Sequence, residues 1–480
     1  MSEARNEAWT DDHAAIGGDR AGSTDTAGAP SVVARLSRLP VTTTHRRAVT
    51  AVGLGLFFEF YEVFLAGVLS GVLVNEFDLT KAELPAVLAS TFVGMFLGAL
   101  LLGRFADRFG RRGAFLLNLG LYSAFSLVGA FSVNALMLMS TRFVAGIGLG
   151  AEPPLADTYL TDLLPSKRRG RFIAWAYTLA FVGVPVVGFL GRGIAQIEVL
   201  GIAGWRWMFV LGALGGVVVF LMRRSLPESP RWLETAGRHA EAEQIVAGME
   251  AEARAAGHAL AEVEGPVATA DTAPAPLSAL FRPPYGRRTA MMTVFHLFQT
   301  FGYYGFGTMV PLVLAAKGYA ISDSLLFTAL TFLGYPVGSA LSLPLVERFE
   351  RKFLVIAALA AMVVCGLAFG LSTSMAAILV FGFLYTAASN VFSNAFHIYQ
   401  AEIFPTQLRS TASSGTYALS RLTTAAMPFV LVPLLAGAGP GAMFAVVAAA
   451  MAIVAINVAV LGPRTTGRAL ESVNVAPAQA

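Results

Sequence analysis

The sequence predicts an all-α membrane protein whose twelve transmembrane helices form two six-helix halves. Three observations support this prediction. Hydrophobic residues make up 56% of the 480 positions and charged residues only 13%, which is about half the charged share of a soluble protein. Twelve apolar segments approach the length of about 20 residues that a helix needs to cross a bilayer. Two charged motifs also recur at one fixed spacing between the first and second halves of the chain.

The apolar segments define the expected helices, because long uncharged runs separated by short polar loops are typical of repeated membrane crossings. The expected spans are 48–74, 84–105, 113–133, 135–161, 170–192, 204–224, 289–315, 323–346, 353–373, 375–401, 411–436 and 440–461. Basic loops alternate with acidic or neutral ones, which predicts that both chain ends lie in the cytoplasm.

These spans divide the chain into five regions. Residues 1–46 have no apolar core of the kind found in a signal peptide, so we expect a disordered cytoplasmic tail. Residues 47–224 and 289–462 are the two expected halves. The intervening region, 225–288, is expected to be a cytoplasmic loop with short helices and a flexible linker. A second cytoplasmic tail follows at 463–480.

An internal repeat supports the division into halves. Asp107 begins the run D-R-F-G-R-R, and Glu347 begins the run E-R-F-E-R-K 240 positions later. Asp162 and Glu402, each followed by a proline after three residues and an arginine after seven, are separated by the same 240 positions. Two charged motifs at one offset indicate duplicated membrane units.

The repeated motifs also predict a cytoplasmic gate, because their charged residues lie at neighbouring helix ends. Ion pairs there would keep the inner side closed while the outer side is open. The expected gate residues are Asp107, Arg111, Asp162, Arg169, Glu347, Arg351, Glu402 and Arg409. The alternative for the arginines is a plain basic loop that only sets the orientation in the membrane.

The fourth expected helix contains Arg142, which should face a cavity and meet an acid. An arginine inside a membrane helix costs about 2.5–3.5 kcal/mol on insertion scales. Glu59 and Glu62 in the first helix are three residues apart and share roughly one face. One acid is either a fixed partner of Arg142 or a carboxylate for which arginine and proton compete. Farther along the fourth helix, Glu152 and Asp157 are expected to be gate or scaffold groups.

The run from Gly103 to Arg112, G-x-x-x-D-R-x-G-R-R, resembles the signature loop between helices two and three of the major facilitator superfamily of transporters. A narrower resemblance, over about residues 48–465, is to its sugar-porter and related organic-ion branches. The motifs that carry it are Tyr61-Glu62, Arg142 with its following glycines, Asp162–Gly170, Pro227–Leu233 and Glu402–Arg409. The resemblance implies that two halves rock about a central site, and it assigns proton coupling to Glu62 and Arg142.

The substrate site departs from that of sugar porters. Their amide-rich motif in helix seven is reduced to Gln299, and Tyr177 stands where they carry a helix-five glutamine. Sugar hydroxyls without partners are costly to bury, so a hexose is not favoured. Arg421 resembles the arginine that meets the substrate carboxylate in organic-anion, aromatic-acid and nicotinate permeases, and its planar guanidinium suits that role. The expected binding residues are Arg421, Gln299, Tyr303, Tyr304, His296, Tyr177, Asn390 and Asn394, with ordinary packing as the alternative for the aromatic ones.

Together these features predict proton-coupled symport of a small organic metabolite, a carboxylate-bearing anion, across the cell membrane of a bacterium by alternating access. The alternatives are a sugar or organic-cation transporter, a drug efflux pump, and a non-transporting nutrient sensor on the same fold. The expected partners are a small-molecule substrate, protons and the lipid bilayer, with a monomer as the expected assembly. The sequence contains no metal-ligand cluster, phosphate-binding loop or nucleophile motif, so neither an enzyme, a cofactor, a metal nor a nucleic-acid partner is expected.

Overall fold

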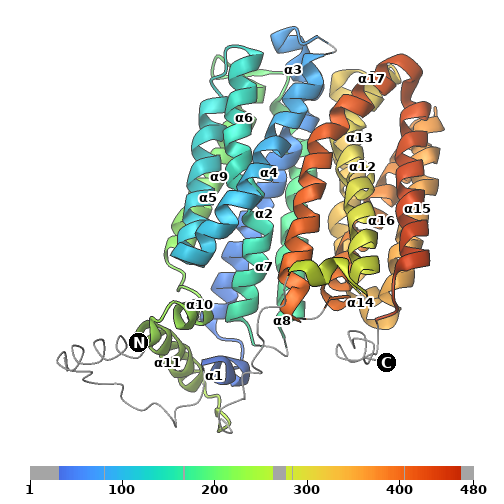
Figure 1. Ribbon diagram of the computed structural model, residues 1–480. Helices are drawn as coiled ribbons and strands as arrows, with labels where there is room; N and C mark the ends of the chain where they lie inside the picture. The colour runs from blue at the N-terminus through green and yellow to red at the C-terminus, as the bar shows by residue number, and fades with distance from the viewer. Residues whose placement is uncertain are drawn as a thin grey trace, which may run out of the picture.

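Long helices run side by side in two bundles, one from each half of the chain (Figure 1). The computed structural model describes residues 32–80, 82–165, 168–262, 277–283, 285–404 and 406–465, without the side chains of 406–415. The expected linker at 265–276 and the two chain ends lie outside the described residues.

The first bundle is built from helices of the N-terminal half. These are α2 (Thr43–Val68), α3 (Ser70–Phe77), α4 (Glu83–Phe109), α5 (Arg111–Gly129), α6 (Ala135–Gly150), α7 (Glu152–Leu163), α8 (Arg169–Ile194) and α9 (Gly204–Arg224). A short antiparallel pair, β1 (Glu198–Val199) and β2 (Ile202–Ala203), joins α8 to α9. The fourth expected span is broken between α6 and α7, because Pro153 and Pro154 supply no backbone N–H to the preceding turn.

The second bundle is built from the C-terminal half. Its helices are α12 (Tyr285–Ala316), α13 (Ile321–Phe332), α14 (Gly334–Arg348), α15 (Arg351–Leu371), α16 (Met375–Glu402) and α17 (Thr406–Leu461). The long α17 is two helices joined at Gly439, whose φ of 83° is a conformation that glycine adopts without strain. In the described part of the chain, eight helices are long and apolar enough to cross a membrane. Because α17 covers two expected spans and others are broken by kinks, the count of twelve crossings stays a prediction.

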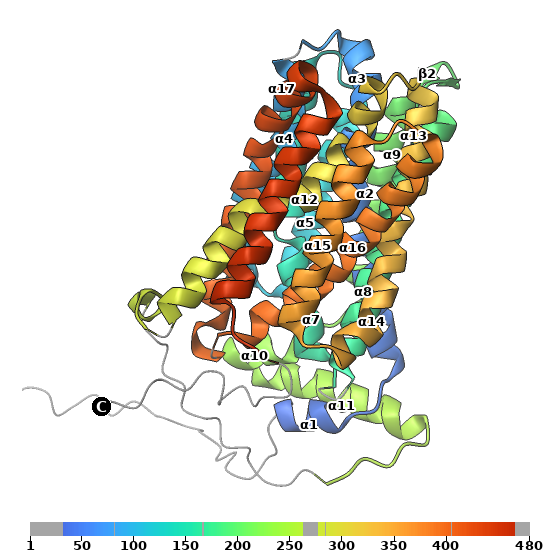
Figure 2. The ribbon, with the colours of Figure 1, turned by 90° about the vertical axis from the view of Figure 1, so that its right-hand side faces the viewer.

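Short helices gather at one end of the two bundles (Figures 1 and 2). They are α1 (Val32–Arg38), α10 (Pro230–Thr235) and α11 (His239–Ala255), and the 3₁₀ helix η1 (Leu277–Phe281) precedes α12. We call this the basic end, because the loop Arg104–Arg112 and the pair Arg223-Arg224 lie there too. The other end, which carries α3 and the β pair, is called the opposite end. The charge rule predicts that the basic end faces the cytoplasm.

The prediction of a disordered tail over 1–46 is wrong for its last part, because residues 32–38 form α1 and α2 already begins at Thr43. Ion pairs to α11 hold α1 in place. Arg35 contacts Glu250 with two nitrogens, each at 3.0 Å, and Arg38 contacts the same carboxylate at 2.6 Å. Glu250 is only 4% exposed. The sequence alone gives no sign that these charges, more than 200 residues apart, meet.

The contact of α1 with Glu250 should depend on pH. Hydrogen bonds from Arg35 lower the pKa of the Glu250 carboxyl to about 2, below the usual value of about 4.3. Its contribution to stability is therefore complete above about pH 4.3 and is lost as the pH falls toward 2. Glu250→Gln should reproduce the acid state at neutral pH and raise amide hydrogen exchange in α1. Glu241→Gln, which removes an exposed partner of Arg238, is the control, and equal protection of α1 in all three proteins would contradict this assignment.

Candidate functional site

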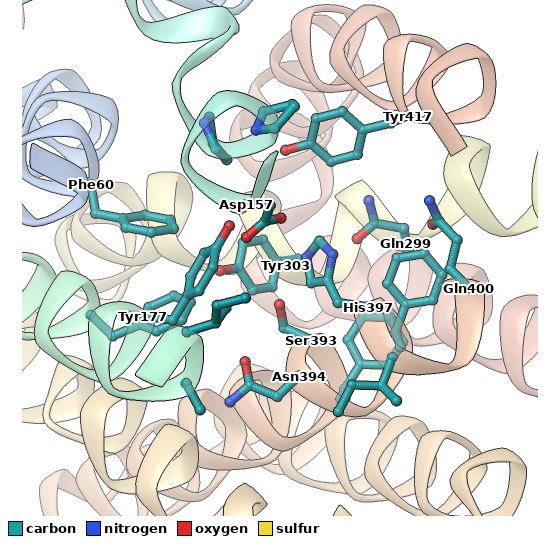
Figure 3. Close-up of a pocket in the computed structure, with 18 of the residues that line it drawn as sticks. Phe60, Asp157, Tyr177, Gln299, Tyr303, Ser393, Asn394, His397, Gln400 and Tyr417 are labelled. Atoms are coloured by element: carbon teal, nitrogen blue, oxygen red, sulfur yellow. The ribbon is translucent and has the colours of Figure 1, made fainter. Parts of the chain in front are cut away.

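A cavity of about 580 Å³ lies between the two bundles. Both halves line it, and its wall combines aromatic rings with polar and charged side chains (Figure 3). The lining extends from Tyr304 and Arg421 to Thr161, Gly170 and Glu402, which belong to helix ends at the basic end. The cavity therefore reaches from the centre of the molecule toward the basic end.

Aromatic side chains close the cavity toward the opposite end. The Phe64 ring lies between the two halves, with ring-centre distances of 6.4 Å to Tyr304, 5.9 Å to Phe332 and 5.8 Å to Tyr335. The Phe181 ring of the first half also stacks on Tyr335 of the second. Such a packed aromatic layer excludes water from the apolar contact. The structure therefore shows a state that is closed at the opposite end.

Two glycines allow the halves to approach closely above this layer. A Cβ on Gly67 would lie 2.8 Å from the Thr308 Cα, and a Cβ on Gly188 would lie 2.8 Å from the Ala329 Cα. Both contacts cross from the first half to the second, and neither leaves space for a side chain. Closure of the opposite end depends on these small residues.

Gly188→Leu should therefore favour the state that is open at the opposite end. Overpacking of this kind costs about 1–3 kcal/mol, which shifts the two populations by a factor of roughly 5 to 150. The measurement is labelling of Thr308→Cys by an impermeant maleimide added at the opposite side, with Cys365 replaced by alanine. The matched control is Gly193→Leu on the same helix, where a Cβ meets nothing within 4 Å. Equal labelling rates in the two variants would show that Gly188 is not a closing contact.

Arg421 is a buried cation in the cavity wall. Its Nη1 donates to the Tyr304 hydroxyl at 2.7 Å, and its Nη2 donates to the Tyr417 hydroxyl. Its Nε has no hydrogen-bond partner, and the side chain is 1% exposed. Among the described residues, no carboxylate lies within 4.0 Å of this guanidinium. Arg421 therefore forms no salt bridge to another helix within the described part of the chain.

Arg142 and Glu62 form a closed ion pair inside the first half. The Arg142 Nη1 lies 2.5 Å from the Glu62 carboxylate, and Nη2 donates to the Glu62 backbone carbonyl at 2.7 Å. Ser126 donates to the second carboxylate oxygen at 2.6 Å, and a Cβ on Gly212 would lie 2.2 Å from it. Neither member of the pair lines the cavity. The expectation that Arg142 meets an acid is confirmed, but the expectation that it faces the cavity is wrong.

Glu59 is the member of the acid pair that lines the cavity. It is 1% exposed, and its Oε2 has no hydrogen-bond partner. No cationic side chain of the described residues lies within 4.0 Å of its carboxylate. A buried charged oxygen without a partner is costly, and this carboxyl group is one of those that line the cavity.

A second buried ion pair joins helices within the first half. Arg223 of α9 contacts Glu152 at the start of α7 and donates to the Ala51 and Val52 carbonyls of α2 at 3.3 and 3.2 Å. Its guanidinium also lies 4.1 Å from the Phe115 ring centre. This pair joins three helices, so the scaffold role expected for Glu152 fits the geometry. Asp157, which shared that expectation, lines the cavity instead.

The structure separates the expected binding residues into two groups. Gln299, Tyr303, Tyr304, Tyr177, Asn394 and Arg421 line the cavity. His296 does not, because it is packed among aromatic rings and bonded to Gln400 at 3.1 Å. Asn390 does not either, because its amide donates to the Tyr335 carbonyl at 2.5 Å inside the contact of α16 with α14. Tyr417 also lines the cavity and was not among the expected residues. Its position one turn before Arg421 is the signal by which the sequence could have identified it.

The expected gate residues form contacts within each half. Asp107 pairs with Arg111 at 2.7 Å, and Arg351 pairs with Glu402 at 3.2 Å. Asp162 accepts a hydrogen bond from Ser229 at 2.8 Å rather than contacting Arg169 within ion-pair distance. No ion pair within 4.0 Å involves Glu347 in the described part, and the side chain of Arg409 lies outside the described residues. The ion pairs of the described gate residues each lie within one half, and a role of these residues in the other state stays a prediction.

Two helical halves around a shared cavity define a membrane transporter of the major facilitator fold. The chain belongs to the sugar (and other) transporter family, whose model matches residues 47–476.

Two relatives and one solved structure show what the chain is similar to. A putative metabolite transport protein, YyaJ of Bacillus subtilis, is 32% identical over 81% of this chain and 86% of its own length. The niacin transporter NiaP of Acinetobacter baylyi is 28% identical over 92% of this chain and 100% of its own length. The xylose transporter XylE of E. coli, in a partially occluded inward open conformation, has a TM-score of 0.72 at 19% identity over 89% of this chain and 100% of its own. The protein is a multi-pass membrane transporter and not an enzyme.

Proposed function

We propose that this transporter carries a small carboxylate-bearing organic anion together with a proton. The observation that supports this most directly is the environment of Arg421. A guanidinium is always charged, and this one lies buried in the cavity with two phenol hydroxyls and no carboxylate partner among the described residues. An isolated buried cation is costly, so an anionic substrate that pairs with it removes that cost.

Charge balance in the cavity favours uptake of a proton with the anion. The charged groups that line it and lack an ion-pair partner in the described part are Arg421, Glu59 and Asp157. A bound monoanion adds one negative charge to this set of groups. Protonation of one acid offsets that charge while the other acid stays charged. One substrate charge therefore brings one proton, and Glu59, with its unpartnered oxygen, is the group that we assign to carry it.

A neutral sugar is the second candidate, because three amide side chains, Gln299, Asn394 and Gln400, line the cavity and XylE is a xylose transporter. Two of the three are already engaged. Asn394 donates to Ser342 at 2.6 Å and to Ser339 at 3.3 Å, and Gln400 bonds to His296. Among these three amides, Gln299 alone has no hydrogen bond in the described part of the chain, so the anion is favoured. The similarity to the niacin transporter NiaP supports the same choice.

Uptake into proteoliposomes tests this proposal. With the lumen more alkaline than the bath, radiolabelled benzoate should accumulate above its equilibrium distribution in liposomes with the transporter and not in empty ones. A proton ionophore should abolish the difference. Xylose accumulation under the same gradient, without benzoate accumulation or competition, would establish the sugar function instead.

A further inference from the structure

The cavity contains a second charge that is held without an ion-pair partner. Asp157 comes from α7, beyond the break at Ala151, and lines the cavity. Its carboxylate and the Tyr177 hydroxyl point toward each other in the cavity (Figure 3). Among the described residues, no cationic side chain lies within 4.0 Å of Asp157.

Opposite charges thus line one cavity without neutralising each other. Arg421 belongs to the second half and is held by the hydroxyls of Tyr304 and Tyr417. Asp157 belongs to the first half, and its carboxylate faces the hydroxyl of Tyr177. The phenols leave hydrogen-bonding positions of the carboxylate and of the guanidinium for a ligand. A ligand with an acidic group and a donor group can satisfy both side chains at once.

We propose that Asp157 is a specificity-determining residue, which accepts a hydrogen bond or a positive charge from a second polar group of the substrate. The preferred substrates are then small acids that also carry a hydroxyl, amino or protonated nitrogen group. This inference rests on the proposed binding of a carboxylate by Arg421. It differs from the assignment of Glu59, whose carboxyl group carries the proton and does not select among acids.

The position of Asp157 relative to the two halves strengthens the proposal. The Tyr177 ring, whose hydroxyl faces Asp157, stacks on the His397 ring of the second half, with ring centres 6.5 Å apart. Both rings and the Asp157 carboxylate lie around the same part of the cavity (Figure 3). A substrate bound by Asp157 therefore lies beside side chains of both halves.

Binding of three matched acids to the purified full chain tests the proposal. The probes are benzoate, 3-hydroxybenzoate and 3-(aminomethyl)benzoate, measured by isothermal titration calorimetry. The parent should bind the aminomethyl acid about tenfold more tightly than benzoate, with the hydroxy acid between them. In Asp157→Asn this preference should disappear, so that the three acids bind with similar affinity. Glu59→Gln removes the other cavity acid that has no ion-pair partner among the described residues, and it should keep the full preference.

Several outcomes would overturn the proposal. One is an Asp157→Asn protein that keeps the preference, or that loses affinity for all three acids equally. Another is loss of the preference in Glu59→Gln. If Asp157→Asn does not fold, Tyr177→Phe is the second test. This variant removes the hydroxyl that faces the Asp157 carboxylate, so the preference among the acids should stay or increase. Loss of the preference in Tyr177→Phe would contradict the proposal. Comparison with benzamide distinguishes failure of the proposed function from failure of the role of Asp157. Equal binding of benzoate and benzamide refutes the carboxylate function. A preference for benzoate over benzamide without discrimination among the three acids refutes only the role of Asp157.

Discussion

Glu59→Gln is expected to abolish proton-driven accumulation of substrate while leaving substrate exchange intact. The carboxyl group lines the cavity and has an oxygen without a partner, so the amide fills the same space but cannot release a proton. Under a proton gradient, the internal concentration should then rise only to equilibrium with the bath. Exchange of labelled for unlabelled substrate needs no net proton movement, so it should continue at a rate similar to that of the parent. Both are measured in the same proteoliposomes.

Glu62→Gln is the informative comparison, because the family resemblance assigns the proton to Glu62. The Glu62 carboxylate is 0% exposed and fully engaged by Arg142 and Ser126. Removing one partner of such a pair costs about 3–5 kcal/mol, so this variant should lose thermal stability, whereas Glu59→Gln should not. Accumulation like that of the parent in Glu59→Gln would remove Glu59 from the mechanism. A stable Glu62→Gln protein that exchanges but does not accumulate would return the role to Glu62.

The difference between these two acids shows where sequence reasoning reached its limit. A spacing of three residues places Glu59 and Glu62 on roughly one helical face, and that face is wide enough to touch both the cavity and the neighbouring helices. What separates them is α9, where Gly212 lets the backbone approach the Glu62 carboxylate. The sequence shows that residue 212 is a glycine but not that it lies beside the Glu62 carboxylate in space. In the same way, Asn390 and Asn394 are one turn apart on α16, and only tight packing of Gly338 against Ala387 encloses the first of them.

The features that the sequence predicted well depend on local physics. Apolar length predicts helices, and the two copies of each charged motif predict two related halves. Features that depend on distant contacts were missed. Helix α1 is too short to be stable alone, and it forms because Arg35 and Arg38 bind Glu250. Asp157 was expected to be a gate or scaffold group, because the sequence shows its distance from the basic residues but not the direction of its side chain.

Replacing Arg421 should reduce the affinity for the substrate in a defined order. A carboxylate gains a charge-assisted hydrogen bond from a guanidinium that a neutral amide cannot make in the same way. Such bonds contribute about 1.5–3 kcal/mol net, so Arg421→Ala should weaken binding of benzoate by roughly ten- to a hundredfold. Arg421→Lys keeps the charge but loses the planar pair of donors, and it also loses the two fixed contacts to Tyr304 and Tyr417. Its affinity should lie between those of the parent and the alanine variant.

The amide analogue shows whether charge is what Arg421 detects. Benzamide should bind the parent weakly and should be little affected by either substitution, because it presents no negative charge to the guanidinium. Arg206→Ala is the control, since Arg206 lies outside the cavity and pairs with Glu76 at 3.5 Å. Calorimetric affinities of benzoate and benzamide for all four proteins complete the measurement. Equal affinity of the parent for acid and amide would show that the cavity does not select an anion, and the remaining free amide, Gln299, would then make a neutral sugar the better-supported substrate.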